Sequence, residues 1–289
     1  MYPIAVWLTP WEFSPTVLAA CVLAGGLYGA GARARRRAGR PAGLWRSSAF
    51  FLGVLLIYAV MQTHFDYFAQ HMFWIHRLQH LVLHHLGPFL IMLAVPHAVM
   101  ANAIPLHFRR TWLYPLWRNR VTRGIYRVVQ QPLLAATVFV GLIFFWLTPS
   151  LHFKAMLDAR LYDVMNWSMV LDGLLFWWLI LDPRGIDEGA RTGFGTRLLL
   201  LWAIMIPQLM LGAYIGLSRT DLYNVYAICG RIWPVSPITD QHIGGLITWI
   251  PSCMMSVVAG LVVFSRWMRR NRSDRTRAEP AVRAPLTST

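Results

Sequence analysis

Long apolar stretches recur along the chain and are separated by polar connections. A helix that crosses a bilayer needs about 20 mostly apolar residues, because each residue adds about 1.5 Å of length. Seven stretches meet this requirement, at residues 15–32, 44–62, 73–95, 132–149, 161–181, 197–217 and 242–264. The pattern therefore predicts an all-α integral membrane protein, with one domain of seven transmembrane helices over residues 1–268.

Composition supports a membrane protein. Hydrophobic residues make up 56% of the 289 residues and charged residues only 13%, about half the share of roughly 25% in soluble domains. The mean hydropathy is +0.46. The three cysteines are odd in number and far apart, so they indicate no disulfide network. A disordered, collagenous or disulfide-framed chain is excluded.

The net charge of +15 is distributed unevenly along the chain. Of the 27 basic residues, 22 fall on alternate connections, at 33–46, 97–131 and 184–197, and in the tail after 264. The opposite connections hold only Lys154, Arg160, Arg219 and Arg231, and Arg77 lies inside the third helix. By the positive-inside rule the N-terminus is predicted outside and the C-terminus in the cytoplasm. This placement also favours a membrane over nucleic acid as the partner.

Two of these basic segments receive a further interpretation. The segment at about 97–131 mixes Trp, Leu and Tyr with Arg. It is interpreted either as an interfacial amphipathic helix on anionic headgroups or as an ordinary basic loop. Residues 269–289 are polar and rich in Arg, so they are predicted to form a disordered cytoplasmic tail.

Ionisable residues are costly inside a bilayer and therefore mark candidate sites. Besides Arg77, seven of them fall within 22 residues: His64, Asp66, His71, His76, His80, His84 and His85. His76, His80 and His84 are spaced i, i+4, i+8 and share one helix face. Two histidines at i, i+4 can hold one metal ion, whereas the alternative is hydrogen bonding between helices. Gly87-Pro88 predicts a kink just beyond this cluster.

A second polar group lies where the seventh helix enters the membrane. Asp240 and His242 are predicted at the depth of His76 and His80, and Gly244-Gly245 permits a close helix approach. One of them is therefore predicted to lie within about 5 Å of that histidine pair as a further metal ligand. The alternative is that Asp240 caps its own helix.

The surroundings of three further polar residues can also be predicted. Asp172, in the fifth helix, needs a polar partner, for which an Arg or His of the third helix is predicted. Arg77 is predicted to reach outward or to pair with an acid such as Asp163. His152 is placed in a loop, which leaves His80 and His84 without a histidine of equal depth on another helix. That arrangement disfavours a haem-binding redox protein, the alternative function.

Three segments resemble the CtaG-type cytochrome c oxidase assembly factors. HRLQHLVLHHLGPFLIMLAVP, at 76–96, resembles the family's H-M-x-Q-H…P-x-L-x-x-x-x-x-P signature. GLLFWW at 173–178 resembles its fifth-helix block, and SPITDQHIGGLITWIP at 236–251 resembles its D-Q-x-x-x-G-L-I-x-W-x-P block. The likeness runs from about Phe65 to Trp267 and covers most of the predicted membrane domain.

The resemblance implies a multi-pass protein of the bacterial plasma membrane that is not an enzyme and assists assembly of a haem-copper cytochrome c oxidase. It implies a copper ion, and oxidase subunits or copper chaperones as partners. The family's third-helix histidines map to His76 and His80, which are the primary ligands expected. His242 and Asp240 follow, and His84 is a deeper candidate. The family pattern also has a histidine pair where this chain has Tyr162 and Asn166.

Overall fold

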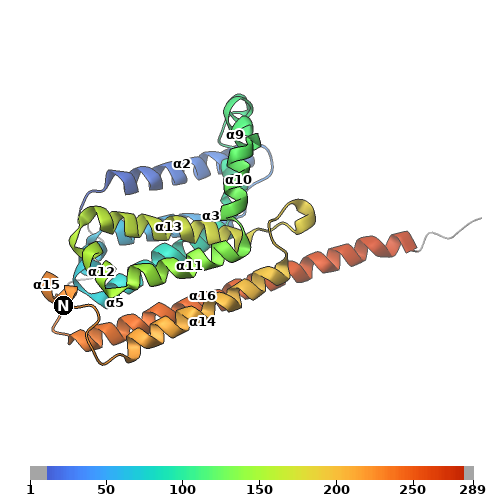
Figure 1. Ribbon diagram of the computed structural model, residues 1–289. Coiled ribbons are helices and arrows are strands. Elements are labelled where there is room, and N and C mark those ends of the chain that lie inside the picture. The colour runs from blue at the N-terminus through green and yellow to red at the C-terminus, as the bar shows by residue number, and fades with distance from the viewer. Residues whose placement is uncertain (1–11, 283–289) are drawn as a thin grey trace, which may run out of the picture.

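The computed structural model describes residues 12–282, and side chains as far as Asp274. Within this range the chain is helical and contains no strand. The long helices lie along one another in a bundle (Figure 1). They are α2 (Pro15–Arg37), α3 (Leu44–Gln62), α11 (Pro132–Leu147), α13 (Ala159–Leu181), α14 (Phe194–Leu217) and α16 (Pro237–Val282).

Five of these helices, α2, α3, α13, α14 and α16, are long and apolar enough to cross a bilayer. A sixth span results if α10 (Arg120–Val129) and α11 count as one, because the two are bent by 62° across a short break. The multi-pass helical architecture is therefore as predicted. The predicted count of seven is not reached by these criteria, because the third stretch is divided into shorter helical segments.

The third stretch consists of α5 (Phe73–His80), a π-helical turn, η1 (Leu81–Leu86), and α6 (Gly87–Leu93). In the π-helical turn, the Gly87 N–H donates to the carbonyl of Val82, five residues back. Pro88 has no N–H to offer the carbonyl of His84. That carbonyl instead accepts a hydrogen bond of 3.1 Å from the indole Nε1 of Trp177 on α13. The π-helical turn thus ends where Gly87-Pro88 begins, and the kink expected there stays a prediction.

Helix α16 packs between α14 and α5 through glycines. A Cβ placed on Gly245 would lie 2.4 Å from the backbone nitrogen of Gly216 on α14, and one on Gly244 would lie 2.3 Å from the ring of Phe73 on α5. Both contacts require the glycine, because a methyl group cannot fit at such distances. The close approach predicted at Gly244-Gly245 is therefore present.

Replacing Gly245 by alanine is expected to lower the stability of the protein by about 1–3 kcal/mol, the usual cost of overpacking. The thermal unfolding midpoint in detergent micelles is the measurement. Gly195→Ala on the same helix pair is the matched control, because nothing lies within 4 Å of its added Cβ. Equal midpoints for the two variants would contradict the close packing of α14 and α16.

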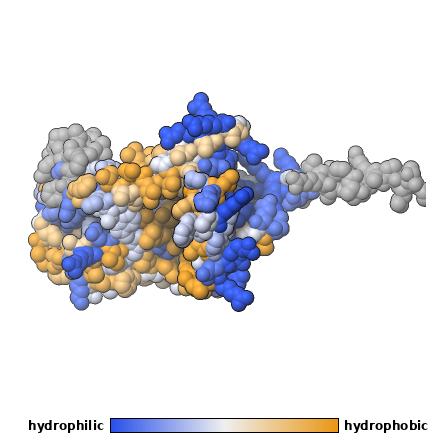
Figure 2. Space-filling view, turned by 90° about the horizontal axis from the view of Figure 1, so that it is seen from above, coloured by the Kyte–Doolittle hydropathy of each residue, from blue (hydrophilic) through white to orange (hydrophobic). Residues whose placement is uncertain are grey.

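Basic side chains hold one end of the bundle together, here called the basic end. The buried guanidinium of Arg197 donates to the backbone carbonyls of Asp182, Arg184 and Thr192, and Arg266 donates to that of Leu181. Figure 2 shows hydrophilic residues gathered where α16 leaves the bundle, beside an apolar band across the middle. The basic connections predicted to share one side of the membrane thus meet at one end.

The segment at 97–131 is helical rather than an irregular loop. It contains α7 (Pro96–Met100), α8 (Leu106–Phe108), a π-helical turn η2 (Arg109–Leu113), α9 (Tyr114–Arg118) and α10. Helices α9 and α10 project from the basic end (Figure 1). On α10 the apolar side chains of Val121, Ile125 and Val128 are exposed and recur at i, i+4, i+7, which places them on one face.

The tail was predicted to be disordered from residue 269. It is instead helical as far as Val282, because it forms the end of α16, which is 46 residues long in all. Arg270 supports this extension by pairing with Asp187 and Glu188 in the connection before α14, and with Asp274 one turn further on. Residues 283–289 of the predicted tail lie outside the described residues. The helix shows no break at the domain boundary predicted at residue 268.

Candidate metal centre

His76 and His80 form a buried pair one turn apart on α5. Their side chains lie in residues only 0% and 1% exposed, and their ring centroids are 4.3 Å apart. None of the four ring nitrogens has a hydrogen-bond partner among the described residues. Burying polar nitrogens without partners is costly, and native proteins largely avoid it. The pair therefore offers two imidazole donors at the i, i+4 spacing that can hold one metal ion.

His152 stands against this pair, although the sequence placed it in a loop. It lies on α12 (Pro149–Leu157), is buried, and its ring centroid is 5.0 Å from that of His76. Its Nδ1 donates to the carbonyl of Trp146, so its Nε2 accepts a hydrogen bond from the Tyr226 hydroxyl at 3.0 Å. Burial lowers the pKa of His152 to about 3, which keeps the ring neutral. Nothing in the order of residues indicates that the α11–α12 corner turns inward.

Tyr162 and Asn166, the two residues that replace histidines of the resembled family, lie on the α13 side of the pair. The ring centroid of Tyr162 is 6.1 Å from that of His76. Asn166 is 2% exposed, and its Oδ1 has no partner among the described residues. The departures from the family pattern therefore border the candidate site.

Asp240 and His242, predicted as further ligands, have other partners. The carboxylate of Asp240 accepts hydrogen bonds from the backbone nitrogens of Phe73 (3.1 Å) and Trp74 (2.9 Å), in the first turn of α5. It also accepts one from Arg231 Nε at 3.3 Å. A ring nitrogen of His242, Nε2, lies 3.0 Å from the carbonyl oxygen of Ser218. Asp240 thus caps a helix as the alternative proposed, but that helix is α5, not its own.

The predicted neighbourhood of the third and seventh spans is confirmed, because Asp240 joins α16 to α5. The predicted three-ligand arrangement is not seen: among residues 12–274, no three His, Cys, Asp or Glu side chains are grouped so that they could hold a metal ion. Asp240 is drawn to unpaired backbone N–H groups at the start of α5, which a carboxylate caps well. The pair of imidazoles remains as the donor set.

A second polar cluster lies deeper in the bundle. His84 Nε2 is 2.8 Å from Asp172 Oδ2, so the predicted partner of Asp172 on the third span is confirmed. His84 also stacks on Phe139 with ring centroids 4.0 Å apart. The Nε2 of His85 lies 3.4 Å from Gln208 Oε1 on α14. One nitrogen of His84 is therefore engaged, which weakens its case as a metal ligand.

The prediction that Arg77 reaches outward or pairs with Asp163 is wrong. It is buried, and its Nε donates to Thr248 Oγ1 on α16 at 3.0 Å, because α16 packs directly over this face of α5. Arg77 and Thr248 border an internal cavity of about 10 Å³, enough for about one water molecule. The cavity is also lined by His80, His84, His85 and Met169.

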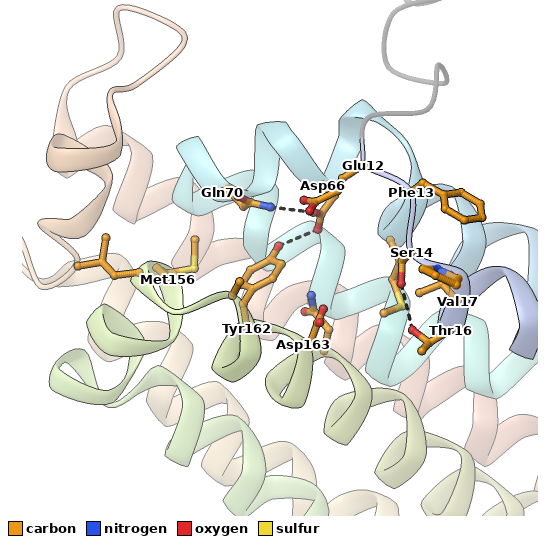
Figure 3. Close-up of a pocket in the computed structure, with 15 residues that line it drawn as sticks. Glu12, Phe13, Ser14, Thr16, Val17, Asp66, Gln70, Met156, Tyr162 and Asp163 are labelled. Atoms are coloured by element: carbon orange, nitrogen blue, oxygen red, sulfur yellow. Dashed lines mark hydrogen bonds between the residues drawn. The ribbon is translucent and has the colours of Figure 1, made fainter.

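An open pocket of about 480 Å³ lies at the end opposite the basic end (Figure 3). Its lining includes Glu12, Asp66 and Asp163, the thioethers of Met61 and Met156, and both Tyr162 and Asn166. Asp66 accepts hydrogen bonds from Gln70 Nε2, Gln79 Nε2 and the Tyr162 hydroxyl, at 2.8, 2.6 and 2.8 Å. Burial nevertheless outweighs these bonds and raises the pKa of Asp66 to about 6.

This shift predicts a pH dependence of stability. The unfolded chain releases the Asp66 proton near pH 3.9, whereas the folded protein keeps it to about pH 6. Stability should therefore fall as pH rises from about 4 to 6, by up to about 3 kcal/mol, and change little from this source above pH 6. Thermal midpoints at pH 4.5 and 7.5 should show this drop in the wild type and a smaller one in Asp66→Asn. The same drop in both proteins would contradict it.

Comparison with known proteins places the chain in a family. The model of the cytochrome c oxidase caa3 assembly factor family matches residues 26–270.

Uncharacterized proteins of Mycobacterium bovis and Mycobacterium tuberculosis are each 27% identical over 289 residues, and one of Mycobacterium leprae is 25% identical over 281. The alignments cover 96%, 96% and 93% of this chain but only 42%, 42% and 41% of those longer relatives. No solved structure matches the chain. Because the family model spans the helices that carry the buried histidine pair, the chain belongs to the cytochrome c oxidase caa3 assembly factors.

Proposed function

We propose that this protein holds a copper ion at His76 and His80 and hands it over during assembly of a haem-copper cytochrome c oxidase. The observation that carries the proposal is the set of four buried ring nitrogens, on two histidines one turn apart, without hydrogen-bond partners among the described residues. Copper is here a cargo, so the protein needs no catalytic group.

The donor chemistry suits copper. Imidazole binds copper well, and thioethers favour Cu(I) in particular. Met169, a residue with a thioether side chain, lines the same cavity as His80. Two imidazoles leave coordination positions open, and a receiving oxidase subunit or a copper chaperone can fill them with its own ligands. A site with few ligands therefore suits transfer better than permanent storage.

Copper analysis tests the proposal. Protein purified in detergent and equilibrated with Cu(I) under anaerobic conditions should retain one copper per chain. The oxidase of cells lacking this protein should be depleted in copper. A visible spectrum with haem bands, in protein that retains no copper, would overturn the proposal and support a haem-binding redox protein. His152, which faces the pair from another helix, uses both ring nitrogens in hydrogen bonds and so offers no axial ligand for that second function.

We further infer seven membrane spans in a bacterial plasma membrane, with α5, η1 and α6 together as the third and α11 as the fourth. The basic end then faces the cytoplasm and the histidine pair lies toward the outer face. The exposed apolar face of α10, with Arg120, Arg123 and Arg127 on the same short helix, suits contact with anionic headgroups.

This orientation makes a direct prediction. A reporter fused after Thr289 should be active only if it works in the cytoplasm, because the basic connections and the C-terminal extension share one side of the membrane. Paired reporters, one active in each compartment, give the measurement. Activity of the externally active reporter alone would show that the orientation is reversed.

A further inference from the structure

The open pocket opposite the basic end has an unusual concentration of negative charge. Glu12, Asp66 and Asp163 line it, in a chain with only 12 acidic residues and a net charge of +15. No basic side chain is among the lining residues that the structure describes. A concave surface lined by charges of one sign raises the local concentration of ions of the opposite sign. The pocket is therefore built to attract cations on an otherwise basic protein.

Soft donors line the same pocket. Met61 and Met156, two residues with thioether side chains, also line the pocket, and thioethers select soft cations such as Cu(I) over hard ones. Asn166 lies on the inner wall, where its buried Oδ1 has no partner among the described residues. Asn166 therefore carries an unsatisfied acceptor in the wall of the pocket.

The inner wall of the pocket is also the outer wall of the metal centre. Tyr162 lines the pocket, and its ring centroid is 6.1 Å from that of His76. In Figure 3 the Tyr162 hydroxyl points to Asp66 at the pocket's inner side. A cation held beside Asn166 and Tyr162 therefore stands one side chain away from the histidine pair.

We propose that this pocket is the inlet through which Cu(I) reaches His76 and His80, with Glu12 and Asp163 attracting the ion and Met61, Met156 and Asn166 holding it in passage. The proposal rests on the copper site proposed above and adds the route by which that site fills. No electron is transferred, since copper enters and is held as Cu(I).

The rate of copper loading tests the inlet. Cu(I), supplied as its cationic acetonitrile complex, is mixed with detergent-purified protein, loading is stopped with excess chelator, and the copper retained per chain is measured over time. Glu12→Gln/Asp163→Asn should load at least about tenfold more slowly than the wild type, since charge focusing speeds association by roughly 10- to 1,000-fold. Met61→Leu/Met156→Leu should also slow loading. Both should reach the wild-type copper content.

Asp221→Asn/Asp274→Asn is the matched control, because it removes two carboxylates that do not line the pocket. The wild type alone provides a second measurement: its loading rate should fall as salt is raised, because salt screens the carboxylates. Loading by the pocket variants at the control's rate, or a wild-type rate independent of salt, would overturn the inlet while leaving the histidine site intact. A lower final copper content in the pocket variants would also overturn it, by making these residues ligands. Failure of the wild type to retain copper would instead overturn the proposed function.

Discussion

Replacing either His76 or His80 by alanine is expected to remove most of the copper bound by the purified protein. A single remaining imidazole cannot chelate, so the copper affinity should fall by about 100-fold or more. Loss of a residue that only supports a ligand already costs roughly 10- to 100-fold in metal affinity. The double variant should be little worse than either single variant, because the two residues act as one unit. Copper content per chain after equilibrium dialysis is the measurement.

Two variants sharpen this test. His107→Ala removes an imidazole from α8, in the segment that leads to α9 and α10, and should retain wild-type copper. His242→Ala tests the ligand suggested by the sequence, whose Nε2 lies beside the Ser218 carbonyl. Copper should also raise the thermal midpoint of the wild type but not of the double variant, since a ligand stabilises only a protein that binds it. Unchanged copper stoichiometry in the double variant would refute the site.

Asp240→Ala should be among the most destabilising single substitutions in the chain. It removes the acceptor for two backbone N–H groups at the start of α5, at a cost of about 0.5–2 kcal/mol for a helix cap. It also leaves Arg231, whose side chain is 11% exposed, without its carboxylate partner. Breaking a buried ion pair typically costs about 3–5 kcal/mol. The thermal midpoint should fall by many degrees.

Further variants separate the contributions of the helix cap and of the ion pair with Arg231 to the stability. Asp240→Asn keeps an oxygen for the cap but loses the ion pair, so its midpoint should lie between those of the wild type and Asp240→Ala. In a double-mutant cycle, Asp240→Ala and Arg231→Ala should be less than additive. Asp221→Ala, an exposed carboxylate at the same end, should change the midpoint little. A midpoint for Asp240→Ala that matches this control would show that the cap is not needed.

Features fixed within one helix could be predicted from residue order. His76 and His80 are adjacent because helical geometry alone brings positions i and i+4 together, and their rings are indeed 4.3 Å apart. Pro88 interrupts the regular hydrogen bonding because it lacks an N–H. The requirement for a partner at Asp172 also followed from the cost of an isolated charge in a bilayer, and His84 meets it.

Contacts between helices could not be predicted in the same way. The sequence of a nearly uniform apolar helix does not indicate how the helix is rotated about its axis or how deep it lies in the membrane. The partner of a polar side chain on such a helix therefore cannot be predicted. Asp240 bonds backbone groups 167 and 166 residues away rather than a shared metal ion. Arg77 is covered by α16, and His152 is carried inward by α12.

The sequence by itself determined that the chain is a helical membrane protein, that its basic connections gather at one end of the bundle, and that two histidines stand one turn apart. These features depend on composition and on the geometry of a single helix, which act locally. Only the tertiary structure decided that α16 caps α5, that Tyr162 and Asn166 stand between the histidine pair and an acidic pocket, and that α16 continues beyond the bundle to Val282. Those outcomes depend on how helices pack, because each polar side chain takes whichever partner the packing brings within hydrogen-bond reach.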